Sequence, residues 1–157
     1  MLELFSFIYF YKEKGNNIMK KRIILTVLTI FTTITSVTPV SAFVEYNPEN
    51  VDLLAHVIMG EAEGGSWELK LDVGSVVLNR VEDDRFEDIL EDVIFEEGQY
   101  ECTWNGRWEL EPSWECREAA AYLLEHGSQL DEKCVWQATF FQGTEIVKYY
   151  EGTYFCK

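Results

Sequence analysis

Glu61 is the residue whose type and position point most directly to chemistry. It continues an apolar helix face formed by Leu54, Val57 and Ile58, at the i, i+3, i+4, i+7 spacing. Removal from water disfavours the carboxylate anion, so a glutamate in line with such a stripe has a raised pKa and can donate a proton to a leaving group. The spacing therefore makes Glu61 a candidate general acid. The alternative interpretation is a half-exposed glutamate at a helix end.

A metal or thiol mechanism finds little support in the chain. The sequence has only two histidines, His56 and His126, and no H-E-x-x-H motif, so we predict no metal site and no cofactor. Cys102 with His126 is the one couple that would suit a thiol peptidase. His126 stands beside Gly127, however, and this position is typical of a helix C-terminus.

Carboxylate chemistry with a single glutamate is the remaining prediction. Glycoside cleavage ordinarily uses two carboxyl groups, but the other acids lie mainly in exposed runs, and Glu63 is about 200° around the helix from Glu61. One glutamate suffices if it protonates the leaving oxygen and then deprotonates a hydroxyl of the sugar itself. Aromatic and amide side chains that could hold sugars are Gln99, Tyr100, Trp104, Asn105, Gln137 and Tyr154.

The N-terminal region predicts export. A basic segment, an apolar stretch and a small-x-small site make residues 19–42 a signal peptide, and we interpret residues 1–18 as a gene-model extension. A retained membrane anchor is the alternative. Of the 13 basic and 28 acidic residues, five basic and two acidic lie before residue 43, so residues 43–157 carry 8 and 26, a net charge of −18. This charge disfavours nucleic acid and anionic lipid as partners.

The four cysteines all follow the signal peptide, and an even number in an exported chain predicts two disulfides. Three pairings are compatible with the sequence. We favour Cys102 with Cys156 and Cys116 with Cys134, with four free thiols as the alternative.

The length of residues 43–157 predicts one domain. Helices are predicted from the Asn47 cap to about Ala62, from the Ser66 cap through Val81, over 86–94, and over 115–126 with Gly127 as the cap. Residues 97–114 read as a loop. Segments 135–142 and 146–155, separated by Gly143 and Thr144, predict a β-hairpin. The fold class is therefore α+β, mainly helical, with a small C-terminal β-hairpin.

Four segments together resemble the SleB/CwlJ cell wall hydrolase family, which comprises the spore cortex-lytic enzymes of germination and their relatives. They are V-I-M-G-E-A-E-G-G (57–65), V-G-S-V-V-L-N-R-V (73–81), V-I-F-E-E-G-Q-Y-E-C (93–102) and V-W-Q-A-T-F-F-Q-G (135–143). The resemblance covers nearly all of residues 43–157 and depends on several ordered motifs rather than on one.

The resemblance implies a compact lysozyme-like, lytic-transglycosylase-type domain that acts on peptidoglycan. The family's catalytic glutamate falls on Glu61. Its asparagine and arginine pair falls on Asn79 and Arg80, where either a structural or a cleft-supporting role is open. The chain departs from the family's G-E-A-R-G-E pattern, because Glu63 replaces the arginine and Gly65 the second glutamate.

We therefore expect an exported, monomeric enzyme of the cell wall or spore cortex that cleaves glycan strands. The expected products have 1,6-anhydro-muramic ends, and a muramidase, in which water replaces the internal hydroxyl, is the alternative outcome. Its partners are peptidoglycan and an accessory protein of the envelope. The alternatives are a non-catalytic wall-binding module and a Cys/His peptidase of peptidoglycan.

Overall fold

The computed structural model describes residues 44–157. The predicted gene-model extension and signal peptide lie outside the described residues. Within residues 44–157, no helix combines the length and apolar character needed to cross a membrane.

Three long helices form where the capping residues predict them. Helix α3 is Pro48–Ala62, and its cap Asn47 accepts a hydrogen bond from the Asn50 amide at 2.8 Å. Helix α4 is Trp67–Glu82 and is capped by the Ser66 hydroxyl. Helix α6 is Trp114–His126, and it ends where the Gly127 amide donates to the carbonyl of Leu123.

The region between α4 and α6 is less helical than its apolar spacing predicts. Helix α5 is only Leu90–Phe95, so the predicted start at residue 86 is wrong. The chain before it bends from Asp83, whose carboxylate accepts hydrogen bonds from the amide and guanidinium of Arg85. The predicted loop contains two single 3-10 turns, η1 (Glu101–Thr103) and η2 (Arg107–Glu109).

The C-terminal segment forms three strands rather than the predicted hairpin of two. They are β1 (Trp136–Ala138), β2 (Ile146–Tyr150) and β3 (Thr153–Cys156), in the antiparallel order β1-β3-β2. Glu151 and Gly152 both have positive φ, which is the conformation of a tight two-residue hairpin turn, and this turn divides the predicted second strand. The prediction of a mainly helical α+β fold is confirmed, whereas the predicted pairing of the first and second segments across Gly143 is wrong.

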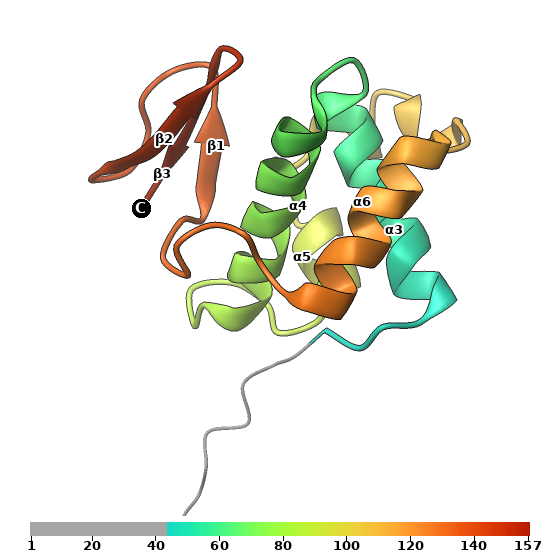
Figure 1. Ribbon diagram of the computed structural model, residues 1–157. Helices are drawn as coiled ribbons and strands as arrows, with labels where there is room; N and C mark the ends of the chain where they lie inside the picture. Colours follow the sequence, from blue (N-terminus) through green and yellow to red (C-terminus); the bar gives the residue numbers. More distant parts are fainter. Residues whose placement is uncertain (1–43) are drawn as a thin grey trace, which may run out of the picture. The chain divides into compact units, whose positions relative to one another are not determined.

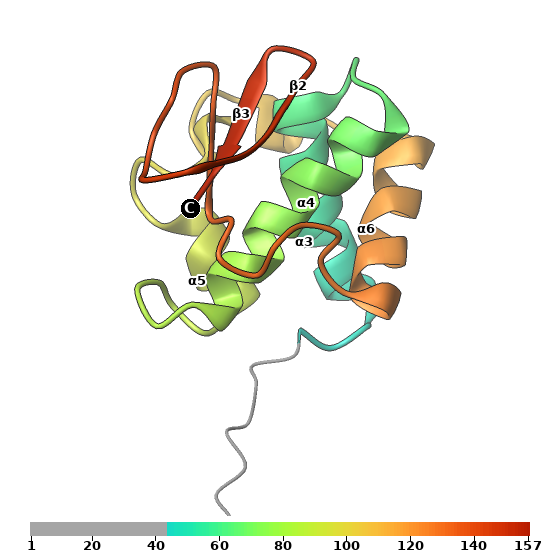
Figure 2. The same cartoon turned by 60° about the vertical axis from the view of Figure 1, so that its left-hand side comes forward.

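Helix α4 is the centre of the fold. Figures 1 and 2 show it between the sheet on one side and α3 with α6 on the other. Its apolar residues contribute to two clusters of buried side chains, one shared with α3, α5 and α6 and one shared with the sheet. It also buries five polar or charged residues, each exposed by 4% or less: Lys70, Asp72, Ser75, Asn79 and Arg80.

The buried polar side chains of α4 fix the chain that follows α6. The Ser75 hydroxyl accepts from the Gln129 amide at 2.8 Å. The Asn79 amide group donates to the carbonyls of Asp131 and Cys134, and Arg80 Nε donates to the carbonyl of Val135 at 2.8 Å. Because these hydrogen bonds run to main-chain atoms, α4 determines the path of the chain into β1.

The C-terminal end of α3 packs tightly against η1. A Cβ atom at Gly60 would overlap the side chain of Cys102, with Cys102 Sγ 2.7 Å away. A glycine at this position therefore allows η1 to approach the last turn of α3, which carries Glu61.

The predicted disulfides are absent. All four cysteines are free and buried. Cys102 and Cys116 belong to the larger apolar cluster, and Cys134 and Cys156 belong to the cluster between α4 and the sheet. Both predicted pairings, Cys102 with Cys156 and Cys116 with Cys134, join residues of different clusters and are wrong for this structure.

We expect Gly60→Ala to lower the free energy of unfolding by about 1 to 3 kcal/mol, because overpacking at Cys102 outweighs the gain in helix propensity of roughly 1 kcal/mol. Urea titration followed by circular dichroism measures the change. Gly64→Ala is the matched control, since no atom lies within 4 Å of a Cβ at that position. A Gly60→Ala variant as stable as the wild type would contradict the close approach.

Candidate functional site

Glu61 lies in the last turn of α3 and is exposed to solvent. The sequence spacing placed it in line with the buried residues of this helix, but the helix ends one residue later, at the turn into α4. The half-exposed helix end that was the alternative interpretation is therefore closer to the observed position. An exposed carboxyl group is accessible to a polymeric substrate, as a general acid must be.

The environment of Glu61 nevertheless raises its pKa, as predicted. Burial among neighbouring protein groups is the main cause, and the charge of Glu101 in η1 adds to it. Two cations, Arg107 and Arg80, lower the pKa and oppose these effects. Glu61 thus lies where α3, α4, η1 and η2 meet, and each segment contributes a charge.

Arg107 was not predicted as a site residue, and it is held in place by three sets of contacts. Its amide donates to the Asn105 side chain at 3.0 Å, and its guanidinium donates to Glu63 at 2.9 Å and to the carbonyl of Met59 at 3.4 Å. The ring of the adjacent Trp108 stacks on the ring of His56 in α3, with ring centroids 4.7 Å apart. The only sequence signal for Arg107 is that it is an isolated cation in an acidic, aromatic loop.

The ion pair of Glu63 with Arg107 also bears on the departure from the G-E-A-R-G-E pattern. Glu63 occupies the position of the family's arginine, and in this chain the cation comes from η2 instead. Arg107 therefore supplies a cation near Glu61 although the arginine of the family pattern is missing.

Arg80 is surrounded by aromatic rings. Its guanidinium carbon lies 5.2 Å from the ring centroid of Phe86, 5.1 Å from that of Tyr100 and 5.6 Å from that of Trp136. Its Nη1 atom is buried and has no hydrogen-bond partner in the protein. Arg80 therefore acts on Glu61 through its charge, from a position fixed by Val135 and by these rings.

The side chain of Asn79 is buried and is not accessible to a substrate. Its side chain is 2% exposed, and both hydrogen bonds of its amide nitrogen go to the main chain before β1. Of the two roles that the sequence left open, the contacts of Asn79 correspond to the structural one.

Tyr100 is buried, whereas a sugar-binding aromatic residue must expose its ring. Its side chain is 1% exposed, which leaves no ring face for stacking, and burial raises its pKa to about 12. Its hydroxyl group is buried without a partner. Gln99, the neighbouring residue, is half-buried, and Trp104 is 57% exposed.

The remaining three predicted sugar-binding residues do not form one surface. The Asn105 side-chain oxygen accepts from the Arg107 amide and holds the turn. Gln137 pairs with Phe155 and Tyr154 with Ala138, so Gln137 and Tyr154 project from opposite faces of the sheet. The ring centroids of Tyr154 and Tyr149 are 4.5 Å apart. The side-chain oxygen of Gln137 is buried and has no hydrogen-bond partner.

The Cys102 and His126 couple is not assembled as a thiol catalyst. Burial raises the pKa of Cys102 to about 11, so this residue is a neutral thiol at physiological pH. His126 lies at the end of α6, where its ring stacks on Tyr122 at 4.3 Å and its Nδ1 contacts the Tyr122 carbonyl.

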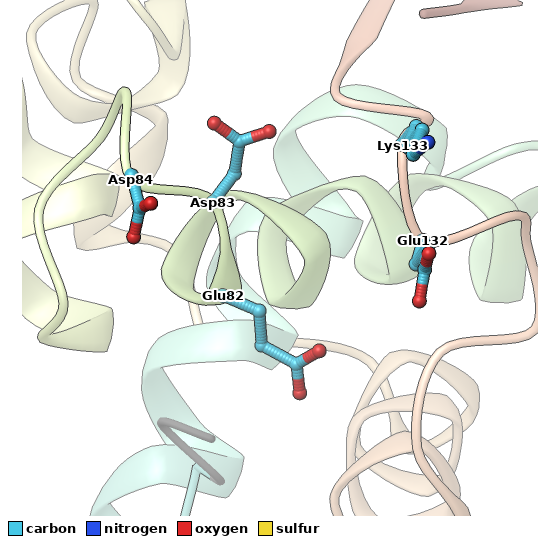
Figure 3. A pocket seen from close by; sticks show the side chains of 5 residues that line it. All are labelled: Glu82, Asp83, Asp84, Glu132 and Lys133. Atoms are coloured by element: carbon cyan, nitrogen blue, oxygen red, sulfur yellow. The ribbon is translucent and has the colours of Figure 1, made fainter. Parts of the chain in front are cut away.

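A hollow of about 300 Å³ lies at the C-terminal end of α4, and Glu61 is not among the residues that line it. Figure 3 shows the carboxylates and the single lysine that line it: Glu82, Asp83, Asp84, Glu132 and Lys133. Among the described residues no group of three or more His, Cys, Asp or Glu side chains is arranged to hold a metal ion.

We expect Glu101→Gln to lower the pKa of Glu61, because it removes a like charge, and Arg107→Gln to raise it, because it removes a cation. A carboxyl titration by carbon NMR in the three proteins measures both shifts. Glu125→Gln, an exposed α6 residue outside the site, is the control and should leave the pKa unchanged. Shifts of equal sign in the first two variants would contradict this electrostatic arrangement.

Comparison with known proteins yields both sequence and structural relatives. A spore cortex-lytic enzyme of Oceanobacillus iheyensis is 35% identical over 74 residues, which are 47% of this chain and 27% of that relative. The catalytic domain of the germination-specific lytic transglycosylase SleB from Bacillus anthracis has a TM-score of 0.63 at 21% identity, with 71% of this chain and 97% of that chain covered. The catalytic domain of the Bacillus cereus SleB protein has a TM-score of 0.64 at 22% identity, with coverages of 71% and 92%.

These structural relatives have the same fold as residues 44–157, at a level of identity that supports the fold alone. The family model described as cell wall hydrolase matches residues 64–154. Glu61 precedes the matched range by three residues, so its role is not part of the match. Since the match spans more than half of the sequence and agrees with the resemblance of its motifs, the chain belongs to the cell wall hydrolase family.

Proposed function

We propose that this chain cleaves the glycan strands of peptidoglycan and that Glu61 is its proton donor and acceptor. The observation that carries the proposal is the state of Glu61. The residue keeps solvent-accessible surface, while partial desolvation by neighbouring protein groups and the charge of Glu101 raise its pKa. Such a group is partly protonated closer to neutral pH than an ordinary glutamate and can reach a polymer. Membership in the cell wall hydrolase family supports peptidoglycan as the substrate. The chemistry of the site supports the glycosidic bond as the bond that is cleaved.

The reaction we favour is that of a lytic transglycosylase. Glu61 donates its proton to the glycosidic oxygen, and the bond from that oxygen to the muramyl C1 breaks. The resulting Glu61 carboxylate then takes the proton of the muramyl C6 hydroxyl, whose oxygen forms the 1,6-anhydro bond to C1. The proton returns to Glu61, no water is consumed, and a single carboxyl group performs both transfers. The solved relative from Bacillus anthracis is described as a lytic transglycosylase, which supports this choice.

A second candidate reaction follows from Glu101. This exposed carboxylate lies close enough to Glu61 to raise its pKa, so the site contains two acidic groups rather than the single one expected from the sequence. With Glu101 as a base, water would replace the C6 hydroxyl, and the product would be a reducing muramic end. The enzyme would then be a muramidase.

The setting of the reaction follows from the predicted export. We propose that the chain acts outside the membrane, in the cell wall or the spore cortex, as a monomer. An accessory protein of the envelope and peptidoglycan itself are the expected partners. The relative from Oceanobacillus iheyensis is named for lysis of the spore cortex, which supports cortex as one substrate.

We expect Glu61→Gln to reduce the release of soluble fragments from purified sacculi by about 10²- to 10⁴-fold, the range for loss of a general acid. The amide keeps the size of the side chain, so the unfolding midpoint should change little. Mass spectrometry of the wild-type products should show anhydro-muramic ends. Glu125→Gln is the matched control and should keep full activity.

Two outcomes of this experiment would reject the proposal in different ways. Undiminished release by Glu61→Gln would remove this residue from the mechanism. Wild-type protein that pellets with sacculi but releases nothing would favour the non-catalytic wall-binding alternative.

We expect Glu101→Gln to retain turnover and to lose activity at a lower pH than the wild type. The active form of Glu61 is the protonated one, so activity falls as the pH rises through its pKa, and removal of the Glu101 charge lowers that pKa. A pH profile of fragment release measures the alkaline limb. Abolished turnover in Glu101→Gln, together with reducing ends in the wild-type products, would favour the muramidase.

A further inference from the structure

Two of the four cysteines adjoin each other where β1 begins. Cys134 is completely buried and Cys156 is 1% exposed, and both lie in the apolar cluster between α4 and the sheet. Cys156 is paired with Trp136, and its carbonyl also accepts from the Val135 amide at 3.1 Å. Cys134 therefore directly precedes the residue that is hydrogen-bonded to Cys156. Burial raises the pKa of Cys134, and the nearby Cys156 adds to this rise.

The main chain on both sides of these two cysteines is fixed by hydrogen bonds. Asn79 of α4 donates to the carbonyl of Cys134 at 2.9 Å. The residue after Cys156 is held by the turn before β2, because the Lys157 amide donates to the Glu145 carbonyl and the Lys157 carbonyl accepts from the Thr144 amide. The main chain that carries the two cysteines is thus held in place on either side of the cluster that contains both side chains.

The other two cysteines have different neighbours. Cys102 packs against Gly60, and the charges that act on it are those of Glu61, Arg107 and Glu101. Cys116 lies in the first turn of α6, where its sulfur accepts from the Ser113 hydroxyl at 3.2 Å. Neither residue is positioned against Cys134 or Cys156.

We propose that Cys134 and Cys156 form a disulfide in the exported protein and that Cys102 and Cys116 remain thiols. The bond would join the start of β1 to the end of β3 and close a loop that contains the whole sheet. Through Cys134 and Val135 it would also restrain the main chain to which Asn79 and Arg80 bind. This proposal is independent of the catalytic role of Glu61.

The oxidation needs an acceptor for two electrons, and we assign this role to a protein or small-molecule disulfide outside the membrane. One cysteine thiolate attacks the disulfide of the oxidant and releases one thiol. The other cysteine thiolate then attacks the mixed disulfide, releases the second thiol and completes the bond, so that two protons leave the two cysteines. Since both residues are buried in the folded chain, the reaction takes place while the chain folds.

The test uses the full chain refolded in a glutathione redox buffer, then denatured, alkylated and digested with trypsin without reduction. Cleavage after Lys133 and Lys148 places Cys134 in 134–148 and Cys156 in 149–157, while Cys102 and Cys116 fall in 86–107 and 108–117. We expect one linked pair, 134–148 with 149–157, and two alkylated peptides. A link of Cys102 to Cys156 or of Cys116 to Cys134, or four alkylated cysteines, would overturn the proposal.

Thermal unfolding with and without a reducing agent gives a second readout. Because the bond closes a loop of about 20 residues, reduction should lower the unfolding midpoint of the wild type by roughly 10 °C. Cys116→Ser is the matched control for loss of a buried thiol and should show the same drop on reduction. The Cys134→Ser, Cys156→Ser double variant should show none, and a reduction-dependent midpoint in that variant would overturn the assignment.

Discussion

A polar group that leaves water without a new partner costs about 1 to 3 kcal/mol, and α4 buries five polar or charged side chains. Each of them must therefore find a partner from another part of the fold. Ser75, Asn79 and Arg80 find main-chain atoms of the segment that follows α6, while Asp72 pairs with Lys148 of β2. The sheet is thus attached to the helices by directional hydrogen bonds as well as by apolar contact, and these bonds specify one position for β1.

The same helix connects the sheet to the candidate site. Arg80 donates to the Val135 carbonyl and carries a charge that acts on Glu61. On the other side of Glu61, Arg107 reaches the last turn of α3 from η2 and pairs with Glu63. Two of the eight basic residues in 43–157 therefore lie near one glutamate, in a segment with a net charge of −18. They limit the rise that burial and Glu101 cause in the pKa of Glu61.

Close packing brings these charges together. Gly60 leaves room for Cys102, which allows η1 to lie against α3 and places Glu101 near Glu61. Trp108 packs between His56 of α3 and Phe95 of α5, with ring centroids 4.7 and 4.8 Å away, and this keeps Arg107 at the helix end. The segment between α5 and α6 has little regular structure of its own, and its position depends on these side-chain contacts.

Local features of the sequence determined the three long helices and the mainly helical fold class. Asn47, Ser66 and Gly127 act on main-chain groups within four residues, so their effects are encoded in short stretches of sequence. The tertiary structure decided the rest, because it depends on residues far apart in the chain. It buried Tyr100, brought Arg107 to Glu61, placed β3 in the centre of the sheet and grouped Cys134 with Cys156. No local spacing encodes these contacts, since each arises only when α4 and the segments around it pack together.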